Sequence, residues 1–221
     1  MIEKSLVEHF WLGPAVWTVL YLLDYALTIH GARLKRACPQ DRYRIEGSYE
    51  LTPYYQPDVD SLHRFSWRLF LMIPVGWSIL GMTWVLTVRG GSFPEVYLAF
   101  LGAMVLVELP IFGRHFMTSS FYRDMALPGA AKGSIEISRW VIYRRSAVEF
   151  FSFSALFLAV FILEQDWLFL GGALKCLATA IRHRFTARRL KDNKLLLNVG
   201  EGPAGKPAPA SGGTDGQAAG P

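Results

Sequence analysis

Long apolar runs alternate with polar and basic segments along the chain. A helix needs about 20 apolar residues to cross the hydrocarbon core of a membrane, and five runs reach or approach that length. They lie at residues 10–29, 67–88, 96–112, 146–163 and 167–181. None of them alternates apolar and polar residues as a barrel strand does, and backbone groups inside a bilayer must bond within their own segment. The pattern therefore predicts an all-α bundle of five transmembrane helices.

The C-terminal end of the chain departs from this pattern. The run at 167–181 is the shortest, and its two glycines and Lys175 leave a tilted or re-entrant segment open. The basic segment at 182–199 either extends the fifth helix or forms an amphipathic helix on the anionic inner leaflet. In the final segment, 200–221, 16 of the 22 residues are Gly, Pro or Ala, which is typical of a disordered tail. We therefore expect a helical bundle over 1–199, followed by this tail.

Basic residues indicate the orientation, because Lys and Arg are retained on the cytoplasmic side of a membrane. The connection between the first two runs holds seven of them, counting Arg68 at its edge, and the connection between the third and fourth runs holds six. The C-terminal segment holds another seven, whereas the opposite side holds only Lys4 and Arg89. Five spans with the N-terminus outside and the C-terminus in the cytoplasm satisfy this bias. The expected location is the plasma or inner membrane of the cell.

The composition agrees with a membrane protein. Hydrophobic residues make up 52% of the 221 residues and charged residues 19%, whereas soluble domains are about one quarter charged. Cys38 and Cys176 are too few for a disulfide framework, and we expect both to be reduced. The net charge of +5 requires no nucleic acid, because the topology accounts for most Lys and Arg. The expected partner is the lipid bilayer with its anionic inner leaflet, and a homo-oligomer or a partner membrane protein stays open.

The sequence lacks the motifs of common membrane enzymes and pumps. It contains no His-Glu-x-x-His, no Gly-x-Ser-x-Gly, no Walker loop and no dinucleotide fingerprint. It also lacks the paired aspartate-rich motif with which membrane transferases hold magnesium diphosphate. These absences favour a protein that is not an enzyme, and the sequence predicts no cofactor.

Four ionisable residues lie inside the predicted spans, where a charge is costly and is by default a candidate for function. They are Asp24, Glu108, Glu149 and Lys175. Each lies four to nine residues from the nearest basic residue at the cytoplasmic end of its own span, which is roughly 6 to 13 Å at the helical rise. We therefore hypothesise that all four converge on one polar cavity that opens to the cytoplasm.

Two further side chains share helix faces with these groups. Thr28 is four residues after Asp24, and His115 is seven residues after Glu108. Carboxylate oxygens suit hard divalent cations, but no closely spaced ligand pair indicates a metal, so the metal stays open. Solvated or hydrogen-bonded roles at interfaces or in loops are expected for the other histidines. They are His9, His30, His63 and His183.

Structural roles compete with the cavity hypothesis. Lys175 can be a structural partner of a carboxylate or reach the interface with its long side chain. Glu149 follows Arg145 by four residues, which favours a local ion pair. Glu108 lies just before a proline, whose kink frees polar backbone groups. Asp24 is deep and has no basic residue within one turn, so it is the strongest single candidate.

Part of the N-terminal region resembles a family of small prokaryotic membrane proteins. In that family an Asp-x-x-x-Thr helix precedes a Glu-x-Asn-Pro turn that leads into the second span. Here Asp24 and Thr28 match the helix and Glu50 and Pro53 match the turn, while Thr52 replaces the asparagine. The resemblance covers about the first 90 residues and implies no activity. It implies that Asp24, Thr28, Glu50 and Pro53 form one site, with the tyrosine-rich loop between the first two helices folding back toward it.

Three functions are compatible with these features. The first is a small transporter or channel-like protein in which Asp24, Glu108 and Glu149 bind a proton, a cation or a cationic solute. The second is a non-catalytic membrane subunit or scaffold, in which Asp24 serves helix packing. The third is an enzyme that acts on lipid head groups, which requires Asp24, Glu50 and His115 to meet at the cytoplasmic surface. The carboxylates favour the first function, and the small number of spans favours the second.

Overall fold

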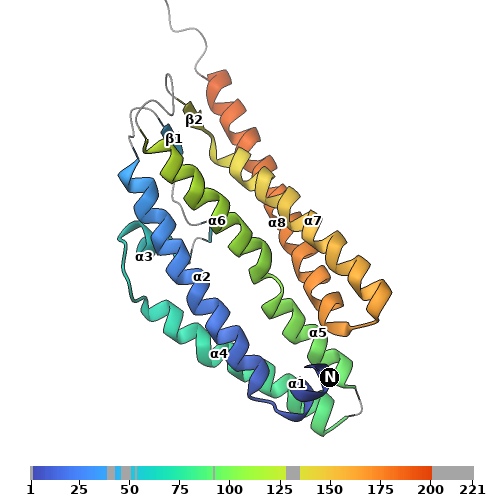
Figure 1. The fold of residues 1–221 in the computed structure, drawn as a ribbon. Helices are drawn as coiled ribbons and strands as arrows, with labels where there is room; N and C mark the ends of the chain where they lie inside the picture. The colour runs from blue at the N-terminus through green and yellow to red at the C-terminus, as the bar shows by residue number, and fades with distance from the viewer. Residues whose placement is uncertain are drawn as a thin grey trace, which may run out of the picture.

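A computed structural model describes residues 2–38, 43–45, 51–52, 54–91, 93–127 and 135–200. These segments are almost entirely helical (Figure 1). The first half contains α1 (Ile2–Glu8), α2 (Leu12–Ala37), β1 (Tyr43–Ile45), α3 (Gln56–Asp60), α4 (Trp67–Trp84) and the π-helix η1 (Val85–Arg89). The second half contains α5 (Pro94–Val105), α6 (Glu108–Met125), β2 (Ile135–Ile137), α7 (Arg139–Glu164) and α8 (Trp167–Gly200).

The described structure is helical, as predicted, and four of its segments are long and apolar enough to cross a membrane. They are Leu12–Ala37, Trp67–Arg89, Pro94–Met125 and Arg139–Glu164. The chain makes five long helical passes, since α8 returns beside α7 (Figure 1). Because α8 is not among the four candidate spans, the crossing by a fifth helix stays a prediction, and so does the orientation.

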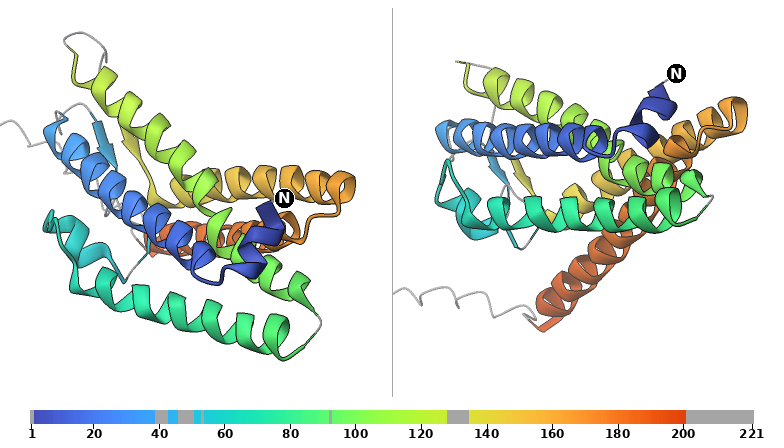
Figure 2. Two further views of the ribbon diagram at one scale, coloured as in Figure 1. Left: turned by 60° about the horizontal axis from the view of Figure 1, so that its bottom comes forward. Right: turned by 90° about the horizontal axis from the view of Figure 1, so that it is seen from below.

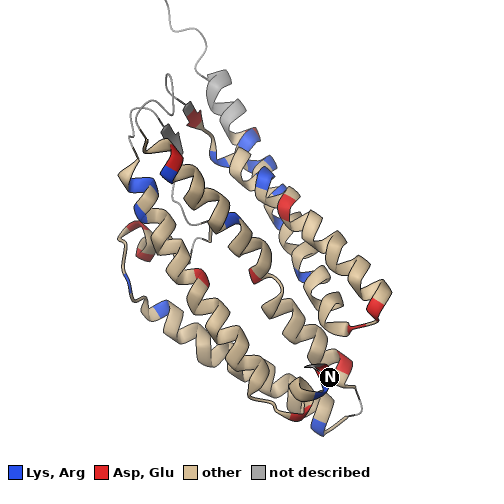
Figure 3. Cartoon of the chain, viewed as in Figure 1, with Lys and Arg blue, Asp and Glu red and all other residues tan. Residues whose placement is uncertain are grey.

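The passes bring the connections rich in basic residues to one end of the molecule. β1 and β2 pair in parallel there, with Tyr43 opposite Ile135 and Ile45 opposite Ile137, as the views in Figure 2 also show. Most Lys and Arg residues lie in the half that holds these strands and the C-terminal part of α8 (Figure 3). This short parallel pair is an exception to the all-α prediction. It forms in the polar connections, outside the apolar runs.

Several helices extend beyond the predicted spans. The first pass continues from residue 29 to Ala37, and the fourth begins at Arg139 instead of residue 146. The reason is that a helix keeps its backbone hydrogen bonds through the basic residues beyond the hydrocarbon core, where long side chains reach water. For 182–199 the structure shows a continuation of α8, so the extension was the correct alternative. The predicted tail from residue 201 onward lies outside the described residues.

The third pass differs most from its prediction. The predicted span at 96–112 is interrupted after Val105, and the helix resumes at Glu108 and continues to Met125. Two residues, Leu106 and Val107, form the break and pack into a hydrophobic cluster with side chains of α7 and α8. The break therefore places Glu108 at the start of α6, inside the bundle.

Close contact between backbones holds α5 against α8. A Cβ atom at Gly102 would overlap the carbonyl group of Leu168, and one at Gly171 would overlap the carbonyl group of Ala99. Small residues allow helices in membranes to approach this closely. The glycines at 171 and 172 were therefore a packing signal, and in the structure they lie within a continuous helix.

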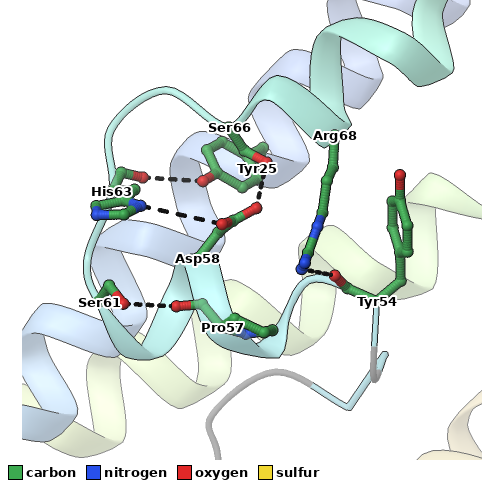
Figure 4. A network of polar contacts seen from close by, with 8 residues as sticks. All are labelled: Tyr25, Tyr54, Pro57, Asp58, Ser61, His63, Ser66 and Arg68. Atoms are coloured by element: carbon green, nitrogen blue, oxygen red, sulfur yellow. Dashed lines mark hydrogen bonds and ion pairs between the residues drawn. The ribbon is translucent and has the colours of Figure 1, made fainter.

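The residues from Tyr54 to Ser66, which include α3, fold back against α2 (Figure 4). The Tyr25 hydroxyl of α2 donates a hydrogen bond of 2.8 Å to the carbonyl oxygen of His63. Ser66 donates to the carboxylate of Asp58, and Nδ1 of His63 lies 3.9 Å from the same carboxylate. Val59 of α3 is buried against the α2 side chains. Within its described residues, the tyrosine-rich loop is therefore packed structure on the first helix.

Candidate functional site

The helices α2 and α6 run side by side in the same direction, with contacts that repeat along their length (Figure 1). Asp24 meets His115 near the middle of the pair, and Cys38 meets Tyr122 near its end. The Cys38 thiol lies 3.5 Å from the Tyr122 carbonyl oxygen and is buried, and burial raises its pKa. This parallel alignment brings together residues about 90 positions apart in the chain.

His115 is at the centre of the contacts between the two helices. Its Nε2 atom lies 2.8 Å from Oδ1 of Asp24 and 3.3 Å from Oγ1 of Thr28. An ionised carboxylate only accepts hydrogen bonds, so the geometry assigns a proton to Nε2 when Asp24 is charged. His115 and Thr28 are buried, whereas the Asp24 side chain is 25% exposed. The structure therefore joins three of the predicted site residues in one hydrogen-bonded group.

Glu108 lies at the helix break and contributes a second carboxyl group. It is the first residue of α6 and is 5% exposed. Its Oε2 atom is buried and has no hydrogen-bond partner within the described part of the chain. Glu108 is also close enough to Asp24 for their charges to interact. We call Asp24, Thr28, Glu108 and His115 the α2–α6 site.

The site lies deep in the helical bundle. Asp24 is twelve residues from Leu12 and thirteen from Ala37, the ends of α2, which is about 18 to 20 Å of helix in each direction. Glu108 is likewise near the middle of the third candidate span, Pro94–Met125. Asp24 is thus nearer to the middle of its helix than its predicted position relative to Arg33 indicated.

Two tyrosines extend the polar groups toward α3. Tyr55 belongs to the tyrosine-rich loop that was expected to fold back, whereas Tyr21 was not among the predicted residues. The hydroxyl groups of Tyr21 and Tyr55 are hydrogen-bonded to each other. Tyr21 is three residues before Asp24, on the same face of α2, and is close enough to Asp24 and Glu108 to interact with their charges. The spacing of Tyr21 and Asp24 was the signal that could have identified it. The contact links the loop that folds back to the α2–α6 site.

Glu149 and Lys175 do not form hydrogen bonds with this group in the described structure. Nε of Arg145 lies 3.0 Å from Oε1 of Glu149, in an i,i+4 ion pair on α7. This is the local ion pair that the spacing of the two residues favoured. Lys175 is exposed on α8, although its charge acts on Glu108. Glu50 and Pro53 lie outside the described residues. The geometry thus brings together Asp24, Thr28, His115 and the nearby Glu108, and it leaves Glu149 apart.

A second polar group lies between α6, α7 and α8. Arg114 donates from Nη1 to Oγ of Ser146 at 3.0 Å, and Nδ1 of His183 lies 2.9 Å from the same oxygen. The ring of His183 is buried between the rings of Tyr143 and Phe150, at centroid distances of 5.3 and 5.7 Å. His183 is therefore hydrogen-bonded, one of its two expected roles, but lies in a helix interface. The contact ties Arg114 to α7, while its positive charge still acts on Glu108.

The α2–α6 site can hold a proton or a cation. Two carboxyl groups and one imidazole offer several positions for a proton, and a deep carboxylate can also balance the charge of a bound cation. Among the residues described, no group of three or more His, Cys, Asp or Glu side chains is arranged to hold a metal ion. No protein-family model, no curated protein and no solved structure matches this chain.

Proposed function

We propose that this chain is a small membrane transporter or channel-like protein, with the α2–α6 site as its binding site for a proton, a cation or a cationic solute. The observation that carries the proposal is the buried oxygen of Glu108, which has no hydrogen-bond partner in the described structure and lies beside the Asp24–His115 pair. Ionisable groups at such depth are expensive to maintain and mark ion or proton pathways.

The charges of the site support this function. When Asp24 is ionised and His115 is protonated, the two charges compensate each other across 2.8 Å. An ionised Glu108 would then be a buried charge without a hydrogen bond, which is costly. A proton on Glu108, or a cation bound beside it, removes this cost. The charges of Arg114 and Lys175 act on Glu108 from a distance, but no described group donates a hydrogen bond to its buried Oε2 atom. A proton or a bound cation at this oxygen would supply the missing partner.

The broken third pass also supports the proposal. Interrupted helices near the middle of the bilayer are typical of transporter binding sites, because their ends leave backbone groups free for a ligand. In this chain the interruption at 106–107 lies directly before Glu108. The carboxyl group is thus at a helix end and not on a continuous helix face.

Proton flux into proteoliposomes tests the proposal. The purified protein is reconstituted with a pH-sensitive dye inside the vesicles, and a potassium gradient with valinomycin drives proton entry. We expect Asp24→Asn to abolish the flux, because the amide keeps the shape of the side chain but cannot be ionised. Glu149→Gln is the matched control, because this carboxylate pairs with Arg145 away from the site. It should leave the flux unchanged.

Insertion and folding of each variant are checked by size-exclusion chromatography and thermal unfolding in detergent. Equal loss of flux in both variants would argue against a role of the α2–α6 site, as would flux that survives Asp24→Asn. If the wild-type protein gives no flux, a membrane subunit or scaffold becomes the better explanation.

A membrane subunit or scaffold is this second function, and the exposure of α4 favours it. Only 17% of the apolar window in Trp67–Arg89 is buried inside the protein, less than in the other three candidate spans. The side chains of Trp67, Met82 and Leu86 are 79%, 64% and 63% exposed. A helix of a partner protein can cover this face, as lipid can. Native mass spectrometry after gentle extraction from the membrane separates the two functions, since a subunit is recovered in a defined hetero-complex.

A further inference from the structure

A groove of about 530 Å³ runs between α7 and α8. Its two ends differ in chemistry. Near the first residues of α7 it is lined by four cationic side chains, Arg144, Arg184, Arg188 and Lys191. Farther along α7, apolar side chains such as Val148, Phe151, Leu177 and Ile181 take their place. Because α7 and α8 are antiparallel, cations from both helices meet at one end and apolar groups from both helices meet toward the middle.

The four cations are exposed. Within the described chain, no carboxylate forms an ion pair with any of them. The nearby carboxylate of Glu149 pairs with Arg145, which does not line the groove. Lys191 lies over the ring of Trp140, 5.7 Å from its centroid, which keeps this ammonium group at the rim of the groove. Four neighbouring positive charges therefore face outward together.

From this arrangement we propose that the groove binds an anionic diacyl phospholipid, with the phosphate among the cations and an acyl chain along the apolar part. Basic pockets between helices on the cytoplasmic side of a membrane bind anionic head groups. A free phosphate ion would make no use of Phe151 or Leu177. A zwitterionic lipid would gain little from four cations without carboxylate partners. The inference concerns a different part of the molecule from the α2–α6 site and does not depend on transport.

Competition between two lipids with identical acyl chains tests the site. The full-length protein is equilibrated in detergent with equal amounts of phosphatidylglycerol and phosphatidylcholine, and native mass spectrometry counts the retained molecules of each. A basic residue near the membrane surface contributes about five-fold to the binding of an anionic lipid. The wild-type protein should therefore retain phosphatidylglycerol over phosphatidylcholine by at least about ten-fold.

Two double variants of α8 separate the groove from general attraction to positive charge. Arg184→Gln/Arg188→Gln removes two charges that line the groove, and Arg182→Gln/Arg189→Gln removes two exposed charges of the same helix that do not line it. Both variants change the net charge equally. At about five-fold for each charge, the groove variant should lower the preference by up to about 25-fold, whereas the control variant should keep it.

Two outcomes would overturn the site. One is an equal fall in preference in both variants, which shows attraction to net charge alone. The other is a wild-type protein that retains both lipids equally. Glycerol 3-phosphate, which carries the anionic group without acyl chains, is added in a separate arm. Its failure to displace the lipid at millimolar concentration supports the role of the apolar part, and complete displacement contradicts it.

Discussion

Two interfaces of this protein are built on opposite principles. In the glycine interface, Gly102 of α5 and Gly171 of α8 bring two backbones into direct contact. In the α2–α6 site, the helices instead meet through Asp24 and His115, whose side chains span the distance between them. The close contact in the glycine interface is possible only because glycine has no side-chain atoms. The α2–α6 site depends on the presence of particular polar atoms.

This difference indicates where the molecule is fixed and where chemistry can take place. Packed backbones tolerate little displacement, and α5 is packed in this way against α8. Because α8 also contacts α7 through a hydrogen bond and an apolar cluster, we call α5, α7 and α8 the rigid frame. An ion pair with a partly exposed carboxylate can gain or lose a proton without moving a helix. The third pass connects the rigid frame with the α2–α6 site, because α5 belongs to the frame and α6 belongs to the site. Glu108 lies at the junction of α5 and α6.

The largest loss of stability is expected when a larger side chain replaces a glycine in the glycine interface. Gly102→Val places side-chain carbons where the Leu168 carbonyl group lies, and neither backbone can yield without separating the helices. Overpacking costs about 1 to 3 kcal/mol where side chains can adjust. Here only backbone is in the way, so we expect a loss of more than about 3 kcal/mol and failure to recover folded protein. Thermal unfolding in detergent measures the effect.

Gly113→Ala is the matched control for this prediction. Gly113 lies in α6, and no atom lies within 4 Å of a Cβ added there. Replacing a helical glycine with alanine stabilises a helix by up to about 1 kcal/mol. A similar loss of stability in both variants would show that the helices tolerate no change at glycine in general, and the comparison of the two interfaces would fail.

The second-largest loss of stability is expected when the histidine of the α2–α6 site is removed. His115→Ala leaves the Asp24 carboxylate without its partner at 2.8 Å. Because this carboxylate is 25% exposed, water compensates part of the loss, and we expect a cost of about 1 to 3 kcal/mol. Thermal unfolding of His115→Ala, Asp24→Asn and the double variant gives the coupling free energy. Independent, additive effects would contradict a direct pair.

The sequence was sufficient to predict the long helical passes because apolar runs of membrane length have few other solutions. It also identified Asp24 from its depth within a predicted span, and Thr28 and His115 from the helix faces that they share with Asp24 and Glu108. It could not show that Asp24 meets His115, because that contact depends on the alignment of two helices 91 residues apart in the chain. The prediction for Glu149 relied on depth alone, but its neighbour Arg145 forms the ion pair locally.

The glycine interface shows a different limit of sequence reasoning. From the sequence, Gly171 and Gly172 indicated a tilted or re-entrant segment, whereas Gly102 lies within an apolar run and indicated nothing. Their importance is visible only when the two helices are placed together. Gly102 and Gly171 each face a carbonyl group of the other helix, and Gly172 faces the side chain of Leu106. The break before Glu108 was missed for a related reason. The apolar run continues through Leu106 and Val107, and their packing against α7 and α8 is a tertiary property.

A smaller effect is expected from the loss of one polar contact in the rigid frame. Ser154 of α7 donates a hydrogen bond of 2.8 Å to the carbonyl oxygen of Ala173 in α8. Ser154→Ala removes this bond and leaves that carbonyl without the serine donor, at a cost of about 1 kcal/mol. Thermal unfolding measures it beside Gly102→Val. A larger loss in Ser154→Ala than in Gly102→Val would mean that polar contacts, not close backbone packing, hold the frame.

The smallest effect is expected at α1, which bridges the two parts of the molecule. Nε1 of Trp84 donates to the carbonyl oxygen of Val7 at 2.9 Å, which ties α1 to α4. A hydrogen bond to Asp166, which follows α7, raises the pKa of Glu3 above its usual value of 4.5, together with burial and the charge of Asp166. The folded state therefore favours the neutral form of Glu3. The attachment of α1 to the frame is strongest below pH 4.5 and weakens as the pH rises through the raised pKa.

A spin label at position 4, introduced by Lys4→Cys, measures this attachment, because Lys4 is exposed on α1. Its spectrum should show restricted motion at low pH and faster motion as the pH rises above 4.5. In Glu3→Gln the amide donates a hydrogen bond to Asp166 without titrating at position 3, so most of the pH dependence should disappear. The same pH dependence in both proteins would place the titrating group elsewhere and would leave α1 attached to the frame by apolar packing alone.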